Sequence, residues 1–404
     1  MRDALMGLFY SKDFDFVVEQ KFDETIKAFA NKTGGKVITW DFLQTRIVYY
    51  ENGAHVSVDF AQSKGSDIAG DLKKRDFTIN ALAIDLKSLF SDTQADIMDV
   101  VNGRDDLEKK IIRNCSTAAF DDDPLRILRG IRFAREFDFE IDPQTFTLMR
   151  DRSHLLARVS RERIKKEFFT ILSLPGIENS LHELLTVGAF KLLIPELDGF
   201  AGILQSYPHQ DNLLEHSLIT AASLELLLNN LKYPFNKYID SINTCLDETI
   251  EEGVTRRSLL MFSELMHDCG KTKTCKINDN KITFYGHDIE GAALNKEIAK
   301  RLGLGRYAQR LVEQITKKHM RILQLSLLDA ITERAKFRLV RDSEEIFWEI
   351  ILLSIADAMA TGNDNAYASR VKDLEDIAHD LVEKRYSNAY EINAQPLLTG
   401  NEIM

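Results

Sequence analysis

The sequence predicts an α+β chain: a small N-terminal domain built on a mixed sheet, followed by an all-α neck and body and a second all-α domain. Three observations carry this prediction. Short β-rich segments broken by glycine occur only in the first hundred residues. From about residue 104 onward, hydrophobic residues recur at helical spacing. With 404 residues and 44% hydrophobic content, the chain can bury more than one core.

Four segments near the N-terminus have the composition of short strands, namely 14–18, 36–39, 45–50 and 55–60. Gly34-Gly35 and Asn52-Gly53 interrupt them. Because Asn-Gly suits a two-residue turn with positive φ, we expect the last two segments to pair as a hairpin around Asn52-Gly53. The predicted domains span residues 1–110, 111–206, 207–370 and 371–404.

Composition limits the class of protein. No apolar run is long enough to span a bilayer, and the N-terminus lacks the pattern of a secretory signal, so we expect a cytoplasmic protein without a membrane partner. Four cysteines without CxxC spacing suit a reducing compartment, and no disulfide is expected. The net charge of -11 argues against nonspecific nucleic-acid binding. Residues 126–170 nevertheless carry eleven Lys or Arg against seven Asp or Glu, which fits either a basic face or a solvated helix surface.

Three carboxylates in the first domain are candidate metal ligands. Asp13 and Asp15 stand two residues apart at the start of a strand and so share one face, where hard Mg²⁺ would find the oxygen ligands it prefers. Asp59 falls off the apolar Val56 and Val58 face, so it can share that surface. The alternative is that all three are ordinary exposed strand residues.

Two segments rich in aspartate and arginine, 71–83 and 122–134, give a sharper signal. In the second segment Arg126, Arg129 and Arg132 recur every three residues near one helix face, as a clamp for phosphates would. The alternative for Asp122 and Asp123 is helix capping. Capping does not explain both segments together.

The order of these motifs resembles the class II tRNA nucleotidyltransferases, which include bacterial poly(A) polymerases. The matching runs cover most of residues 1–170, and they are Arg2-Asp3, Asp13-x-Asp15, Arg75-Asp76-Phe77-Thr78-x-Asn80-Ala81 and Asp122-Asp123-Pro124-Leu125-Arg126. The resemblance implies a polymerase-β-like head in which Asp13 and Asp15 bind catalytic Mg²⁺, and the strand pattern adds Asp59 as a candidate third catalytic carboxylate. The resemblance also implies that Arg75, Asp76 and Asn80 contact the ribose and phosphates of the incoming nucleotide. Our predicted nucleotide site adds the motif residues Arg2, Asp3, Asp122, Asp123 and Arg126 and the helix-face arginines Arg129 and Arg132.

Within that resemblance, Asp123 and Arg126 match the residues that read the base edge of CTP or ATP. A carboxylate acceptor and a guanidinium fork can pair with cytosine or adenine, whereas guanine and uracil would mismatch. Residues 160–167 are similar to the neck helix that supports these residues.

The stretch from Phe60 to Asp71 is shorter than in family members that have a mobile loop there. A shortened loop is associated with enzymes that add only CC. The addition of CC, CCA, A or a longer tail therefore stays open. Family members also continue beyond both ends of this chain, and we expect shortened termini.

The second half resembles the HD superfamily of metal-dependent phosphohydrolases from about residue 208 to 370. His216, His267, Asp268 and Asp357 reproduce the ligand set in order. Imidazole and carboxylate suit a divalent ion of unknown identity, and His287 and His319 are candidates for a second ion. Adjacent His267-Asp268 favours metal binding over a structural role for these side chains.

Three functions follow from this sequence. The leading hypothesis is a template-independent nucleotidyltransferase that adds C or A from CTP or ATP to tRNA or other RNA 3′ ends. The second is an HD phosphohydrolase acting on RNA ends or nucleotides, whose N-terminal half serves RNA binding. The third is a noncatalytic RNA-binding remnant.

Overall fold

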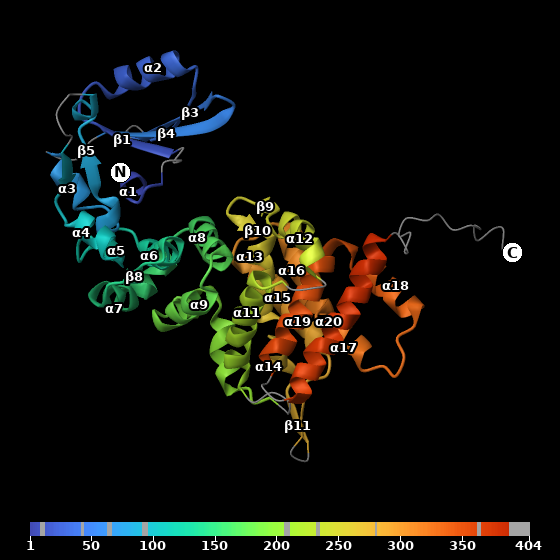
Figure 1. Cartoon of the computed structure of the whole chain (residues 1–404). Coiled ribbons are helices and arrows are strands. Elements are labelled where there is room, and N and C mark those ends of the chain that lie inside the picture. The colour runs from blue at the N-terminus through green and yellow to red at the C-terminus, as the bar shows by residue number, and fades with distance from the viewer. Residues whose placement is uncertain are drawn as a thin grey trace. The chain divides into compact units, whose positions relative to one another are not determined.

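The structure is a computed structural model that describes residues 1–8, 13–41, 44–62, 67–90, 96–205, 211–231, 235–278, 281–361 and 365–387. It divides into two compact units, which are residues 1–126 with 137–152, and residues 127–136 with 153–404. Each unit is described by itself (Figure 1). Among the described residues, no helix combines the length and apolar character needed to cross a bilayer.

The first unit is built on a four-stranded mixed sheet with strand order β1-β4-β3-β2. β1 and β4 run parallel, and β4, β3 and β2 pair antiparallel. The strands are β1 (Asp13–Val18), β2 (Lys36–Asp41), β3 (Gln44–Glu51) and β4 (Ala54–Gln62). The four predicted strands are therefore confirmed. The expected hairpin joins β3 to β4, because Asn52 and Gly53 both adopt positive φ, 51° and 77°.

One face of this sheet carries the small core of the unit. Phe22 and Ile26 of α2 (Phe22–Thr33) pack on Ile47, Val58 and Phe60. Strand residues alternate between faces, so the apolar even-numbered positions of β4 face α2 and leave the odd position 59 on the other side. The remaining elements of the unit are α1 (Arg2–Leu5), α3 (Ile68–Leu72), β5 (Leu82–Ile84), β6 (Ile97–Asp99), α4 (Gly103–Glu108), β7 (Ile111–Ile112), α5 (Ala119–Asp122), β8 (Glu140–Ile141) and α7 (Pro143–Arg152).

The second unit is helical. Helix α6 (Arg126–Phe137) contributes most of its residues to it, and α8 (Arg161–Ser173) packs on α13 (Arg256–Met266), where the rings of Phe169 and Phe262 lie 5.7 Å apart. The other helices are α9 (Ile177–Thr186), α10 (Phe190–Leu193), α11 (Leu213–Asn229), α12 (Ile239–Leu246), α14 (Lys271–Thr274), α15 (His287–Arg301), α16 (Arg306–Lys318), α17 (Arg321–Ser326), α18 (Glu333–Asp342), α19 (Phe347–Ala360) and α20 (Asn365–Tyr386). Two short hairpins complete it, β9 (Thr249–Glu251) with β10 (Val254–Thr255), and β11 (Lys276–Asn278) with β12 (Lys281–Thr283).

Helix α19 forms the centre of the second unit. Nearly all its residues are buried, and it packs against α11, α13, α16 and α20. A helix that is apolar on all sides belongs in a core, so its few polar residues, among them Asp357, need polar partners from neighbouring helices. The predicted boundary at residue 206 falls inside this second unit. The division into four domains stays a prediction.

Candidate active sites in the two units

Asp15 and Asp59 lie on the face of the sheet away from α2. The parallel register pairs Asp13 with Ser57 and Asp15 with Asp59. Paired residues of adjacent strands share a face and lie about 5 Å apart, so Asp15 and Asp59 are neighbours on that face. Asp15 is exposed, whereas the side chain of Asp13 lies outside the described residues. The register therefore supports the expectation that Asp59 shares a surface with Asp15.

Asp59 has a partner that the sequence did not reveal. Arg46 of β3 lies directly opposite Asp59 and donates two hydrogen bonds to its carboxylate, each of 2.6 Å. Such a two-pronged pair is stronger than a single contact. Each Asp59 oxygen accepts one of these bonds and keeps a further lone pair, so Asp59 can bind a metal ion while Arg46 holds it.

Three predicted nucleotide-binding residues form a connected chain. Arg2 donates to Asn80 over 2.6 Å, and the Asn80 amide donates to the Asp76 carboxylate over 3.1 Å. Asp76 is buried and also accepts from the backbone N–H of Phe77. Arg2 further pairs with Asp3 at 2.7 Å. This chain positions Asn80 and brings the first residues of the sequence to the segment around Asp76.

The other predicted arginine of this segment lies at its edge. Arg75 pairs with Asp71 at 3.4 Å, and both side chains remain partly exposed. The guanidinium is therefore held loosely, and a phosphate can compete for it.

Arg126 is held more firmly. Its guanidinium donates to the carbonyls of Ala119 and Lys74 over 3.1 and 2.9 Å. Asp123 is half-buried and accepts from the backbone of Leu125, while Asp122 is exposed. Since two carbonyls fix the fork of Arg126, its other donors keep one orientation, as base reading requires.

The expected arginine clamp is arranged differently. Arg129 and Arg132 belong to the second unit, where Glu167 of α8 faces both at 3.8 and 2.7 Å, and Arg132 also pairs with Glu136. Helix α8 thus supports α6 through Glu167. A phosphate would have to displace this carboxylate from Arg129 or Arg132, and their role as a clamp stays a prediction.

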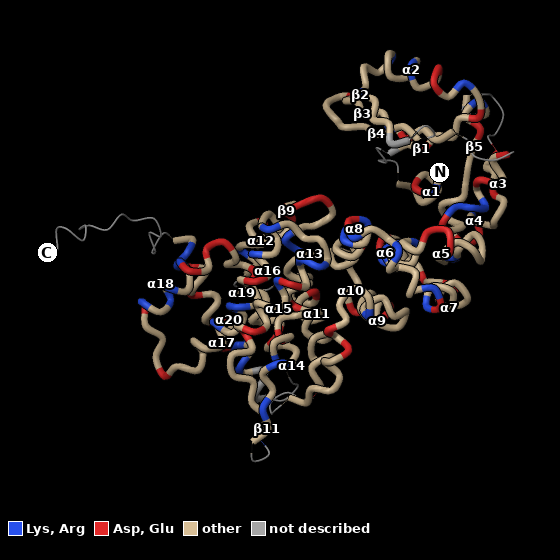
Figure 2. The backbone as a smooth tube through the Cα atoms, turned by 180° about the vertical axis from the view of Figure 1, so that it is seen from behind, with Lys and Arg blue, Asp and Glu red and all other residues tan. Residues whose placement is uncertain are grey.

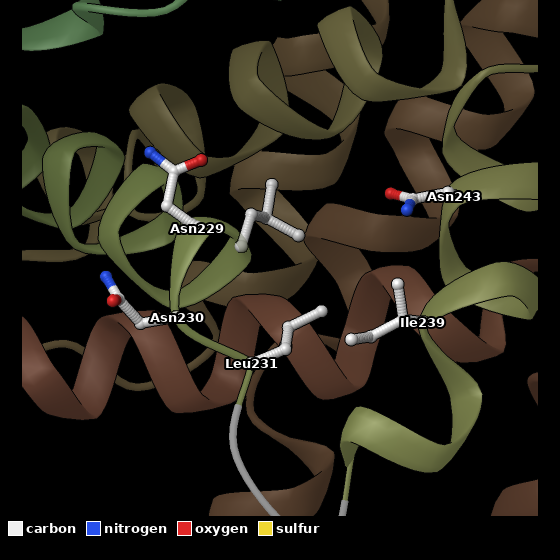
Figure 3. Close-up of a pocket in the computed structure, with 6 residues that line it drawn as sticks. Asn229, Asn230, Leu231, Ile239 and Asn243 are labelled. Carbon is white, nitrogen blue, oxygen red and sulfur yellow. The ribbon is translucent and has the colours of Figure 1, made fainter.

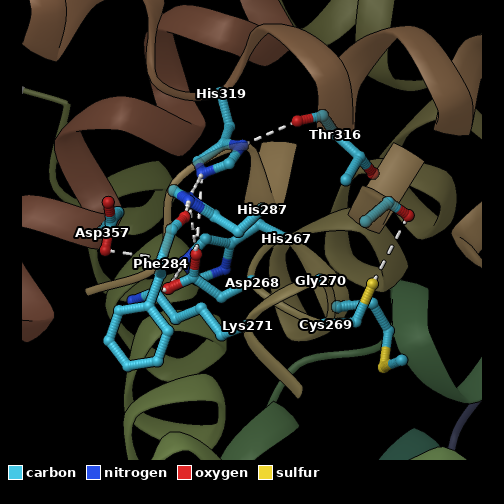
Figure 4. Close-up of polar contacts among 12 residues, drawn as sticks. His267, Asp268, Cys269, Gly270, Lys271, Phe284, His287, Thr316, His319 and Asp357 are labelled. Atoms are coloured by element: carbon cyan, nitrogen blue, oxygen red, sulfur yellow. Dashed lines mark hydrogen bonds and ion pairs between the residues drawn. The ribbon is translucent and has the colours of Figure 1, made fainter. Parts of the chain in front are cut away.

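The six predicted residues of the second half lie together in the second unit. Figure 4 labels five of them, namely His267, Asp268, His287, His319 and Asp357. The six come from α11, from the turn after α13, from the first residue of α15, from the turn after α16, and from α19. Their ligand atoms form two groups whose members lie within 4.8 Å of one another, namely His216, His267 and Asp357, and Asp268, His287 and His319.

Asp268 connects the two groups. Its Oδ2 atom lies 3.2 Å from Nε2 of His267 and 3.7 Å from Nε2 of His216. Its Oδ1 atom lies 3.2 Å from Nε2 of His287 and 3.6 Å from Nε2 of His319. One carboxylate with an oxygen on each group can bridge two metal ions.

The protein fixes which nitrogen each histidine offers. Nδ1 of His267, His287 and His319 lies 2.7, 2.8 and 2.6 Å from a backbone carbonyl oxygen three residues earlier. A carbonyl only accepts, so Nδ1 donates in these three rings, and Nε2 faces the centre, where it can bind a metal ion once it has lost its proton. Nε2 of His287 and Nε2 of His319 face each other at 3.2 Å. A proton shared between these two nitrogens satisfies that contact in the absence of metal, and the imidazole and carboxylate donor set fits divalent metal ions.

Burial and the neighbouring charges act in opposite directions on the ionisable groups of this centre, and the neighbouring charges dominate. Burial lowers the pKa of His267, but the Asp268 and Asp357 carboxylates outweigh it and hold that pKa well above its ordinary value. Burial raises the pKa of Asp268, yet Lys271 and His267 outweigh it and hold this pKa well below the usual range. Hydrogen bonds from His216 and His267 likewise outweigh burial and lower the pKa of Asp357. Both carboxylates are therefore ionised, as ligands must be.

Lys271 also belongs to this site. Its Nζ lies 2.5 Å from Asp268, donates to Gln205 over 2.6 Å, and sits 5.3 Å from the ring of Phe284. A buried ammonium beside the bridging carboxylate can orient it and can attract a phosphate.

A separate hollow of about 240 Å³ lies at the far end of α11 (Figure 3). His216 is near the start of this helix and Asn229 is its last residue, so about 20 Å of helix separates the hollow from the histidine centre. The hollow holds no ionisable side chain among the residues that line it, which are Leu228, Asn229, Asn230, Leu231, Ile239 and Asn243.

Comparison with known protein families matches three parts of the chain. The poly(A) polymerase head domain matches residues 1–113, the probable RNA and SrmB-binding site of polymerase A matches 138–200, and the HD domain matches 213–362. The three occur in the order that the motifs predicted. Over its head and RNA-binding segment the chain is similar to the poly(A) polymerases and tRNA nucleotidyltransferases, and it carries an HD domain behind them.

Individual relatives agree with this assignment. A CC-adding tRNA nucleotidyltransferase of Geobacter sulfurreducens is 43% identical over 175 residues, which is 43% of this chain and 39% of the relative. The chain thus spans about two fifths of that relative's length. An A-adding tRNA nucleotidyltransferase of Deinococcus radiodurans is 26% identical over 100% of this chain and 84% of the relative. The fold is similar to that of the Thermotoga maritima CCA-adding enzyme complexed with tRNA, with a TM-score of 0.63, 22% identity, and 99% and 81% of the two chains covered.

Proposed function

We propose that this chain extends RNA 3′ ends, those of tRNA above all, by adding C or A from CTP or ATP without a nucleic-acid template. The observation that carries the proposal is the strand register that makes Asp15 and Asp59 neighbours on the open face of the head. The names of the relatives, CC-adding and A-adding tRNA nucleotidyltransferase, support tRNA as the acceptor. We place the reaction in the cytoplasm.

In the proposed reaction, the RNA 3′-hydroxyl attacks the α-phosphorus of the nucleoside triphosphate. A bond forms between this phosphorus and the 3′ oxygen, the bond to the pyrophosphate oxygen breaks, and the hydroxyl proton passes to water. Mg²⁺ bound by Asp13 and Asp15 would supply charge neutralisation and an activated hydroxyl. The Arg2, Asn80 and Asp76 chain would hold the triphosphate and ribose, and Asp123 and Arg126 would read the base edge.

The test is extension of a labelled tRNA that lacks its CCA end, with CTP, ATP and Mg²⁺. We expect the wild type to lengthen the tRNA by up to three nucleotides. Asp15→Ala should abolish extension and retain tRNA binding, and Asp23→Ala, an exposed acid on α2, should match the wild type. Extension by Asp15→Ala at the wild-type rate would show that the sheet carboxylates are not the metal ligands.

A second activity is favoured by the position of Asp268 between the two ligand groups. We propose that the HD centre hydrolyses phosphate esters of RNA ends or nucleotides. A water oxygen bonds to phosphorus, the phosphorus–oxygen ester bond breaks, and the alcohol leaves with a proton. Two divalent ions would lower the pKa of the attacking water and neutralise the phosphate.

Metal-stripped protein titrated with Mn²⁺, Co²⁺ or Ni²⁺ tests this second activity. We expect two ions per chain in the HD unit, one after His319→Ala, and none that binds tightly after Asp268→Ala. Hydrolysis of a 2′,3′-cyclic nucleotide should appear with the metal and vanish in Asp268→Ala. If the wild type hydrolyses nothing with any of these ions, the HD centre is not a phosphohydrolase.

A further inference from the structure

The β11–β12 hairpin has both its ends at the histidine centre. It follows α14, whose first residue is Lys271, and it leads into α15, whose first residue is His287. Nζ of Lys271 and Nε2 of His287 lie 2.5 and 3.2 Å from the two carboxylate oxygens of Asp268. Figure 1 shows β11 projecting from the helices of the second unit. The hairpin therefore stands beside the centre, although none of the predicted site residues belongs to it.

The residues between the hairpin and α15 are fixed to the centre. The ring of Phe284 lies 5.3 Å from Nζ of Lys271, and its carbonyl oxygen lies 2.8 Å from Nδ1 of His287 (Figure 4). Gly286, at a positive φ of 78°, turns the chain between Tyr285 and His287. Tyr285 is 85% exposed. Because two residues span at most about 7 Å, this exposed ring stands close to His287.

The centre opens to solvent on the same side. The side chains of His287 and Asp357 are 13% and 18% exposed, whereas the other four predicted ligands expose at most 4% of their side chains. A substrate phosphate must therefore approach the metal ligands past His287 or Asp357. On the His287 side, the rest of the substrate meets Tyr285 and the hairpin.

Two lysines share one face of the hairpin. The strands pair Lys276 with Thr283 and Lys281 with Asn278, and residues two apart along a strand face the same side. The two lysines stand in rows that are about 7 Å apart along the strands. Both residues are exposed, and neither has an acidic partner in the part of the chain that the structure describes.

These groups suit a strand of RNA better than a mononucleotide. A cyclic mononucleotide has one phosphate, which the centre would take, so the lysines would have no anion to bind. A strand has further phosphates, and an exposed aromatic ring gives its bases a face on which to stack. Residues 271–287 contain four lysines and one acid in a chain of net charge -11. A polyanion thus meets local positive charge beside the centre.

We propose that the β11–β12 hairpin and Tyr285 bind the last nucleotides of a single-stranded RNA whose 3′-terminal phosphate lies at the histidine centre. Lys276 and Lys281 bind phosphates of the strand, and Tyr285 stacks on a base. The proposal rests on the phosphohydrolase activity proposed above and narrows its substrate to RNA ends. Tyr285 and the two lysines determine specificity and take no part in the bond cleavage.

Lysine acetylation tests the contact without requiring hydrolysis. The full chain with Mn²⁺ is labelled in the presence and absence of a six-nucleotide RNA that ends in a 2′,3′-cyclic phosphate, and peptide mass spectrometry reads the labelling. We expect the RNA to lower labelling of Lys276 and Lys281 at least threefold. Lys300, exposed on α15 about 20 Å of helix beyond His287, should not change. Unchanged labelling of both hairpin lysines overturns the proposal, and so does equal protection by ATP.

Kinetics with Mn²⁺ then separates the hairpin from the metal ligands. We expect KM for this RNA to lie at least tenfold below KM for a 2′,3′-cyclic mononucleotide. Lys276→Gln with Lys281→Gln should remove most of that difference at unchanged kcat. Lys296→Gln with Lys300→Gln takes the same charge from α15 and should preserve it.

The ring of Tyr285 has its own pair of variants. Tyr285→Ala should raise KM for the RNA at least fivefold, whereas Tyr285→Phe keeps a stacking ring and should retain the wild-type KM. Equal KM values for the RNA and the mononucleotide in the wild type overturn the proposal, as does an unchanged KM in Tyr285→Ala. If neither substrate is hydrolysed, the phosphohydrolase activity fails on its own, and the acetylation result decides whether the hairpin binds RNA.

Discussion

Substitution of Arg46 distinguishes a catalytic role of Asp59 from a structural one. The carboxylate of Asp59 is bonded to Arg46 and lies beside Asp15. If Asp59 helps catalysis, its substitution removes a metal ligand, whereas loss of Arg46 leaves that ligand in place. We therefore expect Asp59→Asn to lower kcat for CTP or ATP addition at least 100-fold, and Arg46→Gln to lower it less than tenfold. Single-turnover kinetics on the shortened tRNA measures both. Equal losses in the two variants would instead assign Asp59 the structural role of holding Arg46.

Two cysteines should resist alkylation near neutral pH. Burial, assisted by a nearby carboxylate, raises the pKa of Cys115 and of Cys245 to about 12. The thiolate is the reactive form, and a thiol with this pKa is about 0.01% ionised at pH 8. We expect iodoacetamide to leave both unmodified at pH 8, with the rate rising tenfold per pH unit up to the pKa. Peptide mass spectrometry after timed labelling checks this, and rapid labelling in the folded protein at pH 8 would contradict it.

Glu167 links α8 to α6. Its side chain is 12% exposed and faces the partly buried Arg129 and Arg132. Removing it takes one acceptor away from each of two guanidinium groups. Water around the partly exposed Arg129 compensates for part of the lost interaction. We expect Glu167→Ala to lower the free energy of unfolding by about 1–2 kcal/mol, measured by urea denaturation. Glu162→Ala, an exposed position on the same helix, should change it by less than about 0.5 kcal/mol. Equal effects of the two substitutions would mean that the ion pair contributes nothing.

The elements of the head could be predicted because their signals are local. Alternating apolar residues gave the strands, and Asn52-Gly53 gave the turn between β3 and β4. The pairing of Arg46 with Asp59 could not be predicted, because it depends on which residues of two strands lie opposite each other. The same holds for Glu167, whose contact with Arg132 joins two helices 35 residues apart. Spacing along one helix suggested a phosphate clamp and could not show the carboxylate facing it.

More of the histidine centre could be predicted than the wide separation of its residues along the chain suggests. The resemblance to the HD superfamily, carried by the order of the ligands and the His267-Asp268 pair, was enough to name the six residues that the structure brings together. The bridging orientation of Asp268 and the carbonyl bonds that fix each Nδ1 were not predictable, because they require side-chain positions from five separate elements.

At the scale of the molecule, most of the positive charge in residues 126–170 is internally paired. At least seven of the eleven basic side chains there have an acidic partner, among them Arg129, Arg132, Arg135, Arg150, Arg152, Lys165 and Lys166. The β9–β10 hairpin contributes two of these acids, Glu251 and Glu252, while Figure 2 shows basic and acidic residues interspersed along the tube. The excess of basic residues in the sequence therefore overstates the charge offered to RNA.

This pairing predicts a shallow salt dependence of tRNA binding. If four basic side chains of residues 126–170 contact phosphates, the slope of log affinity against log salt is about -3 to -4. The hairpin makes the argument testable, because Glu251→Gln with Glu252→Gln releases Lys165 and Lys166. We expect this double variant to bind tRNA more tightly at low salt and to steepen the slope by about 2, since each added phosphate contact contributes about 0.9. Fluorescence anisotropy across a salt series measures it. Glu344→Gln with Glu345→Gln removes the same charge far along the sequence, and an equal steepening there would show that net charge, rather than these lysines, sets the slope.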